Sequence, residues 1–319
     1  MEGDFKMIDK LICPDCKTGI MFDKDKLRCT NCKMDFKIVE GIPLLLPKSL
    51  SYFKKTEMNF YKKEFLDKKN QFGFVESEWN KDSFGLLDFI DGFDSLPKNS
   101  KILEIGAGNA QYSLILNKKG FKNTTASDIS PNGLLSAKKT YNKYDSSYVV
   151  VDAENIPFES NTFDVVFLTA ALHHLPDPEK GIAEMKRCVK RGGLIIVAVE
   201  PNTWYYYLLR PILKLLRLRR INKSKDSFSI ADEVTHGFTL SRLKKYFKRQ
   251  HIKIVKIQRV WYLTGIVYYL PEFIKRLIKV NVSFSPKIRF MTLKIDKMIA
   301  KIPLISRFSF HNTVIGVKK

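Results

Sequence analysis

The stretch KILEIGAGNA, residues 101–110, carries the strongest fold signal in this chain of 319 residues. A short apolar run ends there in small residues, which is the pattern of a buried strand that turns tightly into a helix beside a nucleotide. A dinucleotide site needs Gly-x-Gly-x-x-Gly/Ala, but counting from Gly106 places Gln111 where the third small residue belongs. The spacing therefore excludes a dinucleotide. It leaves an acidic residue followed by small residues at intervals of two: Glu104, Gly106, Gly108 and Ala110.

Short runs rich in β-branched residues alternate with helical patterns around this turn. Helices are expected to begin near Asn109, Pro131, Asp177 and Thr239. This alternation is typical of a βαβ series, so we predict a parallel sheet covered by helices on both faces. The expected strands are residues 101–106, 123–128, 147–152, 163–169, 193–200 and 251–260, with a last strand at 312–319.

Two acidic residues stand at the ends of expected strands. Asp128 ends the second strand and Asp152 ends the third. A carboxylate at the first of these places suits the two hydroxyl groups of a ribose. Taken singly, either residue is better explained as a helix N-cap or a solvated turn. Their joint spacing with Glu104 favours a cofactor that contains a nucleoside.

Together these residues resemble the first motifs of the class I S-adenosylmethionine-dependent methyltransferases, and residues 100–200 resemble the type 11 methyltransferases throughout. The resemblance implies an α/β fold with a Rossmann-like, doubly wound sheet of seven strands, six parallel and the seventh antiparallel, and a helical insertion before the last strand. Ala110 departs from the glycine that is usual in this family, and its methyl group disfavours positive φ. The cofactor, S-adenosyl-L-methionine, would be held by Glu104, Gly106, Ala107, Gly108, Asp128, Ile129, Asp152, Ala153, Glu154 and Thr169.

In this interpretation the acids have distinct partners. Glu104 is placed to compensate the ammonium group of the cofactor, because adenosylmethionine carries no phosphate for the turn to bind. The resemblance further implies that Asp152 accepts a hydrogen bond from the adenine amino group, while the backbone amide of Ala153 meets the ring.

Four of the five cysteines lie close together near the N-terminus, as Cys13, Cys16, Cys29 and Cys32. The spacing C-x2-C-x12-C-x2-C lets four thiolates converge on one tetrahedral Zn²⁺, and a site filled by four protein ligands is structural rather than catalytic. A pair of disulfides, or unligated thiols, is the alternative. We predict a zinc ribbon over residues 1–47, in which 35–47 form the last strand and the start of a linker. Cys188 lies in a helical pattern and is expected to be a core thiol.

The positive charge of the chain is concentrated in its last third. Residues 201–319 carry 26 Lys and Arg against 5 Asp and Glu, whereas the ribbon is nearly balanced. We divide the chain into the ribbon (1–47), a linker with lid helices (48–98) and a methyltransferase domain (99–319). Two segments of the last part, 203–225 and 265–305, are predicted to form basic amphipathic helices. Their apolar stripes are either core contacts beneath a solvated basic face or part of a surface that binds a polyanion.

The sequence shows neither an apolar core of signal-peptide length nor an apolar run of spanning length. We therefore expect a cytoplasmic protein, either free or attached peripherally to the inner face of the membrane. Aromatic residues cluster in the basic segments, which favours an anionic membrane surface, although such side chains also stack on RNA bases. They are Trp204, Tyr205, Tyr206, Tyr207, Trp261, Tyr262, Tyr268 and Tyr269.

Methyl transfer from a sulfonium is an in-line displacement, so holding the acceptor in a dry pocket supplies most of the catalysis. A base is needed only for an acceptor that arrives protonated. The candidates are His173 and His174 after the fourth strand, Glu200 after the fifth, and His236. Helices of the lid segment are expected to close over the cofactor with their aromatic residues Tyr52, Phe53, Phe60 and Tyr61.

Three functions remain open at this point. The first is methyl transfer to a small or lipid-like acceptor. The second is RNA methylation, because a zinc ribbon ahead of this fold resembles the ribosomal guanine-N1 methyltransferases. Strand four, however, ends in LTAALHHL and lacks the Asn/Asp-Pro-Pro-aromatic turn of enzymes that methylate amino groups of nucleic acids. The third is an adaptor that keeps the fold without catalysis, which the intact cofactor positions disfavour.

Overall fold

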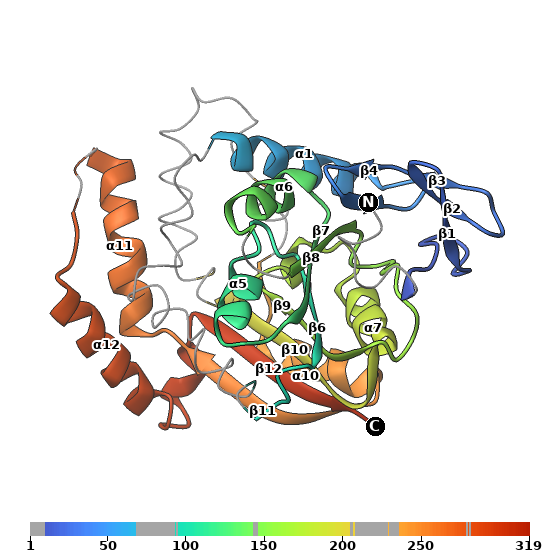
Figure 1. The fold of residues 1–319 in the computed structure, drawn as a ribbon. Helices are drawn as coiled ribbons and strands as arrows, with labels where there is room; N and C mark the ends of the chain where they lie inside the picture. The colour runs from blue at the N-terminus through green and yellow to red at the C-terminus, as the bar shows by residue number, and fades with distance from the viewer. Residues whose placement is uncertain are drawn as a thin grey trace.

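The protein is built around one large twisted sheet with helices on both faces (Figure 1). The computed structural model describes residues 10–67, 93, 95–142, 146–204, 207, 229, 236–278, 280 and 282–319. The strands, in their order across the sheet, are β11 (Ile252–Val260), β12 (His311–Lys318), β10 (Val189–Pro201), β9 (Phe163–Thr169), β6 (Lys101–Ile105), β7 (Asn123–Asp128), β8 (Ser146–Val151), β5 (Ile42–Leu45) and β4 (Ile38–Val39).

Seven of these strands form the sheet expected from the sequence. Strands β8, β7, β6, β9 and β10 pair in parallel, and β12 pairs antiparallel with both β10 and β11. The strand order reverses between β6 and β9, because β7 and β8 lie on one side of β6 while β9 and β10 lie on the other. In open parallel sheets, ligands bind outside the carboxyl ends of the strands at such a reversal.

The N-terminal segment differs from its sequence-based interpretation. Residues 35–47 were expected to complete the ribbon, but only β3 (Asp35–Phe36) pairs with the ribbon strands β1 (Ile20–Asp23) and β2 (Lys26–Cys29). Strand β5 instead pairs in parallel with β8, and β4 pairs antiparallel with β5, so the main sheet has nine strands rather than seven. The cause is burial, since Ile42 and Leu45 are almost fully covered in this position.

The ribbon itself is packed onto the sheet domain. The backbone amide of Ile12 donates to the carbonyl of Pro157 at 3.1 Å, and Leu11 forms an isolated bridge with Phe158. Cys13 and Cys29 belong to the same buried cluster as Val151 and Phe158. The ribbon therefore supports the segment that follows β8.

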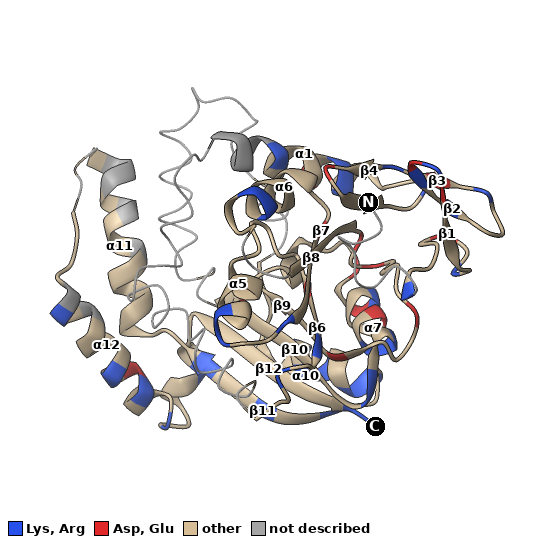
Figure 2. Ribbon diagram, in the orientation of Figure 1, with Lys and Arg blue, Asp and Glu red and all other residues tan. Residues whose placement is uncertain are grey.

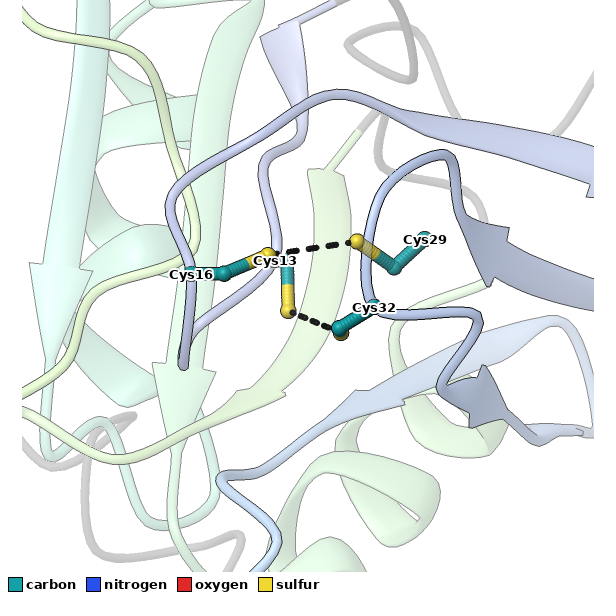
Figure 3. Close-up of side chains that lie close together, drawn as sticks. All are labelled: Cys13, Cys16, Cys29 and Cys32. Carbon is teal, nitrogen blue, oxygen red and sulfur yellow. Dashed lines mark hydrogen bonds between the residues drawn. The ribbon is translucent and has the colours of Figure 1, made fainter.

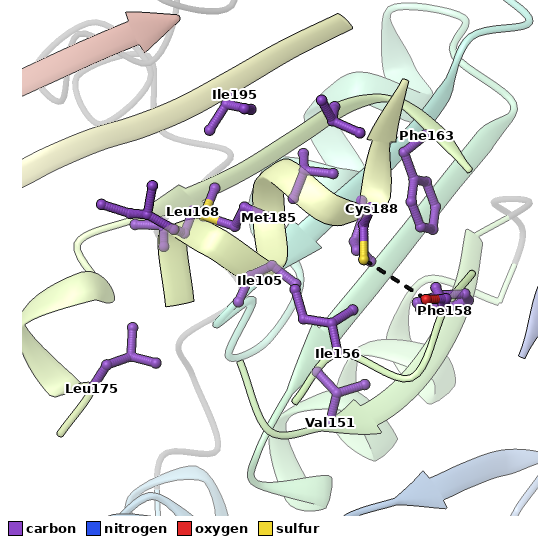
Figure 4. Close-up of a cluster of buried hydrophobic side chains, with 14 of the residues drawn as sticks. Ile105, Val151, Ile156, Phe158, Phe163, Leu168, Leu175, Met185, Cys188 and Ile195 are labelled. Carbon is purple, nitrogen blue, oxygen red and sulfur yellow. Dashed lines mark hydrogen bonds between the residues drawn. The ribbon is translucent and has the colours of Figure 1, made fainter. Parts of the chain in front are cut away.

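Each face of the sheet is covered by its own helices. Helices α5 (Gln111–Lys118) and α6 (Pro131–Thr140) pack on one face, and α7 (Pro178–Cys188) and α10 (Leu240–Arg249) pack on the other. Helix α7 begins after Asp177, whose side chain accepts from the amide of Lys180. Its buried residues include Met185 and Cys188 (Figure 4), and burial raises the pKa of the Cys188 thiol to about 12. Cys188 is thus the core thiol that was predicted.

The predicted insertion between the last two strands is a pair of helices, α11 (Leu263–Ile278) and α12 (Pro286–Ile299). The buried carboxylate of Asp296 joins them, because it accepts from the amides of Tyr262, Leu263 and Thr264 at 2.8–3.2 Å and so caps the first turn of α11. A short 3-10 turn, η4 (Ile305–Phe308), leads into β12. Among the described helices, none combines the length and the apolar character needed to cross a bilayer.

Two predicted segments are only partly described. Helix α1 (Tyr52–Asp67) belongs to the expected lid segment, of which residues 68–92 lie outside the described residues. The predicted basic helix at 203–225 also lies outside them, apart from residues 203, 204 and 207. The division of the chain at residues 47 and 98 stays a prediction.

Candidate active site

The glycine turn after β6 has three backbone positions in the left-handed region. The φ angles are +66° at Gly106, +55° at Gly108 and +56° at Ala110. A Cβ on Gly106 would lie 2.6 Å from that of Ala171 in the loop after β9, so only glycine fits there. Ala110 adopts the conformation that its methyl group disfavours, at a cost of about 1–2 kcal/mol, which explains why glycine is usual at this position in the family that the motif resembles.

Asp128 organises the turn from the end of β7. One carboxylate oxygen accepts from the amide of Gly108 and the other accepts from the amide of Ser130, both at 2.8 Å. Burial raises the pKa of Asp128, while these two amides lower it. The side chain lines the adjacent cavity and is in place to accept further hydrogen bonds from a ligand.

A cavity lies at the carboxyl ends of β6, β7, β8 and β9. Seven of the residues predicted from the sequence line it: Gly106, Gly108, Asp128, Ile129, Asp152, Ala153 and His174. Its wall is completed by residues of the strands and of the loop after β9, namely Ile105, Val151, Ala170, Ala171, Leu175 and Pro176. Helix α1 contributes Lys54, Glu57 and Tyr61, which lie on one face of that helix at spacings of three and four.

Several predicted cofactor residues are not part of this wall. Ala107, Glu154 and Thr169 do not line the cavity, and neither does Glu104. The carboxylate of Glu104 accepts from the amide of Ser113 at 2.9 Å and from its hydroxyl at 2.5 Å. Burial raises the pKa of Glu104 to about 8, against the lowering effect of these bonds. Its predicted contact with the cofactor ammonium stays a prediction.

Asp152, the acid that the resemblance assigns to the adenine, has a partner that the sequence did not indicate. The ammonium group of Lys54 lies 2.7 Å from Oδ2 of Asp152 and 2.6 Å from Oε2 of Glu154. Asp152 also accepts from the side chain of Asn155 and from the amide of Glu154. Since a carboxylate has about four acceptor positions, one remains for a ligand. Glu154 further accepts from the amide of Asp177 at 2.7 Å, so it holds the start of α7.

Of the two predicted histidines after β9, only His174 lines the cavity. Its Nδ1 lies 3.0 Å from a carboxylate oxygen of Glu57, and its Nε2 lies 3.3 Å from the hydroxyl of Tyr61. The hydroxyl of Ser229 lies 2.8 and 2.9 Å from the two oxygens of Glu57. A carboxylate beside Nδ1 favours the tautomer that is protonated there, which leaves Nε2 as the basic nitrogen.

His173 does not line this cavity and has a different partner. Its Nδ1 lies 2.9 Å from Oε2 of Glu200, which is fully buried. Glu200 also accepts from the amides of Ala171, Leu172 and His173 and so holds the turn η2 (Leu172–His174) at the end of β9. In this geometry both residues position the loop that carries His174.

His236, the third predicted base, does not line the cavity either. It contacts the ring of Tyr207, with ring centroids 6.4 Å apart. In the loop that follows, Gly237 packs so closely against the backbone of Pro201 that a Cβ would not fit. The amide of Phe238 donates a hydrogen bond to the carbonyl of Pro201.

The sequence-based prediction missed Lys54 and Glu57. The only available signal was their helical spacing with Tyr61, which was itself expected to cover the cofactor. Helix α1 is rich in charged residues along its whole length, so no pattern distinguishes a buried lysine from the exposed Lys55 beside it. The acids that bury Lys54 lie about a hundred positions away.

The four clustered cysteines converge as their spacing predicts (Figure 3). Sγ of Cys13 lies 3.7 Å from that of Cys32, Sγ of Cys16 lies 3.4 Å from that of Cys29, and all four lie within 4.8 Å of one another. Zn–S bonds of about 2.3 Å in a tetrahedron place sulfurs about 3.8 Å apart, so the cluster fits a zinc ion. A hydrogen bond from the hydroxyl of Thr18 lowers the pKa of Cys16 to about 5, which favours the thiolate.

Comparisons with known proteins agree with this geometry. The profile of a methyltransferase domain family matches residues 103–197. A 2-methyl-6-phytyl-1,4-hydroquinone methyltransferase of Synechocystis is 30% identical over 161 residues, which cover 47% of each chain. A demethylmenaquinone methyltransferase of Staphylococcus haemolyticus is 28% identical over 50% of this chain and 71% of its own. A tRNA U34 carboxymethyltransferase of Nautilia profundicola is 29% identical over 39% of this chain and 41% of its own.

A solved structure shares the fold. Phosphoethanolamine N-methyltransferase 2 of Haemonchus contortus, in complex with S-adenosyl-L-methionine, superposes with a TM-score of 0.52 at 17% identity, over 86% of this chain and 61% of its own. The match to the first of the curated relatives spans about half of that protein. Within residues 103–197, the profile match, the strand order and the glycine turn coincide. Residues 103–197 therefore match a methyltransferase domain in sequence, within a fold that a solved methyltransferase shares.

Proposed function

We propose that this chain is an S-adenosylmethionine-dependent methyltransferase whose acceptor is a small or lipid-like molecule. The observation that carries the proposal is the cavity at the reversal of strand order, where Gly106, Gly108, Asp128 and Asp152 meet. When bound, adenosylmethionine supplies an electrophilic methyl group on a sulfonium. The two acids would hold its ribose and adenine, with Glu104 behind the turn.

The residues around the cavity support a role in proton transfer from the acceptor. His174 faces the cavity with Nε2 as its basic nitrogen, and Glu57 stabilises the imidazolium that forms when a proton is taken. Tyr61 of helix α1 places its hydroxyl 3.3 Å from Nε2 of His174, so this hydroxyl would either orient the acceptor or pass the proton. His174 would accept the proton that the acceptor loses when it takes the methyl group from the sulfonium.

A tailed, ring-bearing acceptor has the better support within this class. Two relatives are named for prenylated quinone precursors, one of them a hydroquinone whose hydroxyl proton suits a histidine base. We also propose peripheral attachment to a membrane, where such acceptors reside. RNA methylation remains the alternative, because one relative is named for tRNA and the last third of the chain is strongly basic.

The acceptor class is tested by following the labelled methyl group. The full chain is incubated with methyl-tritiated adenosylmethionine and either 2-methyl-6-phytyl-1,4-hydroquinone, demethylmenaquinol or unmodified tRNA. We expect the label in the organic phase with at least one of the two quinols, and loss of this label in Asp128→Ala. Label confined to the tRNA, or absent from every acceptor, would contradict the proposal.

A further inference from the structure

Helix α12 buries two polar side chains and exposes much of its apolar stripe. Thr292 and Asp296 are buried, and they face α11 through contacts with Thr264 and with the amides of its first turn. Of the predicted stripe, Ile288 (39%), Met291 (54%) and Met298 (68%) are exposed, while Ile295 is half-buried. The sequence pattern alone left this stripe open as a core contact. The structure places most of it on the surface instead.

Exposed apolar side chains are concentrated on this part of the molecule. Among the side chains that the structure describes, 14 of the 19 large hydrophobic residues that are exposed fall within residues 263–308. We call this surface the hairpin face. Surfaces that gather many exposed apolar side chains commonly mark interaction sites. Its members are Leu263, Ile266, Leu270, Ile278, Val280, Val282, Ile288, Phe290, Met291, Met298, Ile302, Leu304, Ile305 and Phe308.

Positive charge is interleaved with these apolar side chains. Residues 261–310 carry nine Lys and Arg against two acids, and one of the two, Asp296, is buried as the cap of α11. Lys287 and Lys294 are exposed on the same helix side as Met291 and Met298, and Figure 2 shows Lys and Arg along α12. Long cationic side chains beside apolar ones are the pattern of a helix that lies in a membrane interface.

The hairpin also has the geometry to reach a flat surface. Figure 1 shows α11 and α12 side by side at one edge of the molecule, away from the ribbon and beyond the β11–β12 edge of the sheet. The pair is fixed at its base by Asp296 and by the buried ring of Trp261, which packs against Tyr268 and His311. The exposed residues are thus presented by a supported element.

We infer that the hairpin face binds the surface of an anionic lipid bilayer, with its apolar side chains in the interface and its lysines at lipid phosphates. The inference rests on the proposed function and deepens it, because a tailed acceptor would be taken from the same bilayer. The positive charge of the hairpin face favours an anionic bilayer over a neutral apolar partner, because each Lys or Arg near an anionic membrane strengthens binding about fivefold. A second copy of the chain would bring two positive faces together.

The test is flotation of the full chain with vesicles of phosphatidylcholine alone or mixed equally with phosphatidylglycerol. We expect binding to the mixed vesicles only, falling with added salt. Lys294→Glu with Lys301→Glu should weaken it at least about tenfold. Lys244→Glu with Lys245→Glu, which make the same charge change at exposed positions of α10, should weaken it much less. Met291→Ser with Met298→Ser should also weaken binding, whereas Met21→Ser in the ribbon should not.

Three results would overturn the inference. They are absence of flotation with the mixed vesicles, equal losses for the two lysine pairs, and light scattering that shows a dimer which the Met291→Ser, Met298→Ser variant converts to a monomer. Adenosylmethionine binding by calorimetry is measured on each variant in parallel. If the unaltered chain binds the cofactor but does not float with the mixed vesicles, only the docking surface is refuted. If the unaltered chain does not bind the cofactor, the proposed function is refuted.

Discussion

Lys54 and Asp152, which are 98 positions apart in the sequence, form a buried ion pair with Nζ 2.7 Å from Oδ2. Glu154 accepts from the same ammonium group, so one lysine of α1 forms ion pairs with two acids beside the cavity. The pair ties the N-terminal helix to the loop after β8 and closes that end of the cavity.

Replacing Lys54 by Met should destabilise the protein strongly. The substitution leaves two buried carboxylates without their cation, which costs about 3–5 kcal/mol in the free energy of unfolding. Urea unfolding followed by circular dichroism measures the change. Lys55→Met is the matched control, because Lys55 is exposed on the same helix. Equal stability of the two variants would show that the ion pair contributes little.

The free energy of unfolding should depend on pH through Glu104. Its pKa is about 8 in the folded protein and near 4.5 in the unfolded chain, so the folded state binds more protons between these values. Stability contributed by the protonated form is therefore lost as pH rises from about 4.5 to 8, by an amount on the order of a few kcal/mol. Glu104→Gln should flatten the pH dependence over this window. An unchanged slope would contradict the raised pKa.

The cysteine cluster should hold one zinc ion per chain. Cys29→Ser removes a buried ligand, so we expect the purified variant to lose zinc and to unfold at a lower temperature. Cys188→Ala should keep the metal, because the thiol of Cys188 lies in the hydrophobic core at the end of α7. Zinc is measured by elemental analysis and unfolding by calorimetry. Full zinc content in Cys29→Ser, or none in the unaltered chain, would refute the assignment.

His174→Gln should lower the turnover number of methyl transfer by about 10²–10⁴-fold while changing cofactor affinity only slightly. Glu57→Gln should show a smaller loss, since it weakens only the support of Nδ1. Turnover in His174→Gln equal to that of the unaltered enzyme would assign His174 to packing alone.

Much of the sheet domain could be predicted because its signals are local. Each of these signals is carried by residues that are close together in the sequence. They are the alternation along each strand, the glycine turn and the acid at the end of a strand. The seven expected strands and the lining positions of Asp128 and Asp152 followed from them. The cysteine spacing predicted the cluster for the same reason.

The rest depends on contacts between distant segments. Strand β5 joins the main sheet because its apolar residues find β8, about a hundred positions away, and no local pattern distinguishes that partner from the ribbon. Lys54 is buried only because α1 lies over two acids. Asp296 of helix α12 is buried because it caps a neighbouring helix. Each of these features follows from a tertiary partner that overrides the local pattern.

The central claim is that the cavity at the ends of β6, β7 and β8 binds S-adenosylmethionine. Isothermal titration calorimetry of the full chain and of Asp128→Ala tests it most directly. Asp164→Ala is the control variant, because the Asp164 side chain accepts from the amide of Lys101 and from the ammonium group of Lys190. We predict binding of about one cofactor per chain, weakened by about 1–3 kcal/mol in Asp128→Ala and unchanged in the control. No measurable binding to the unaltered chain, or equal affinity in Asp128→Ala, would contradict the claim.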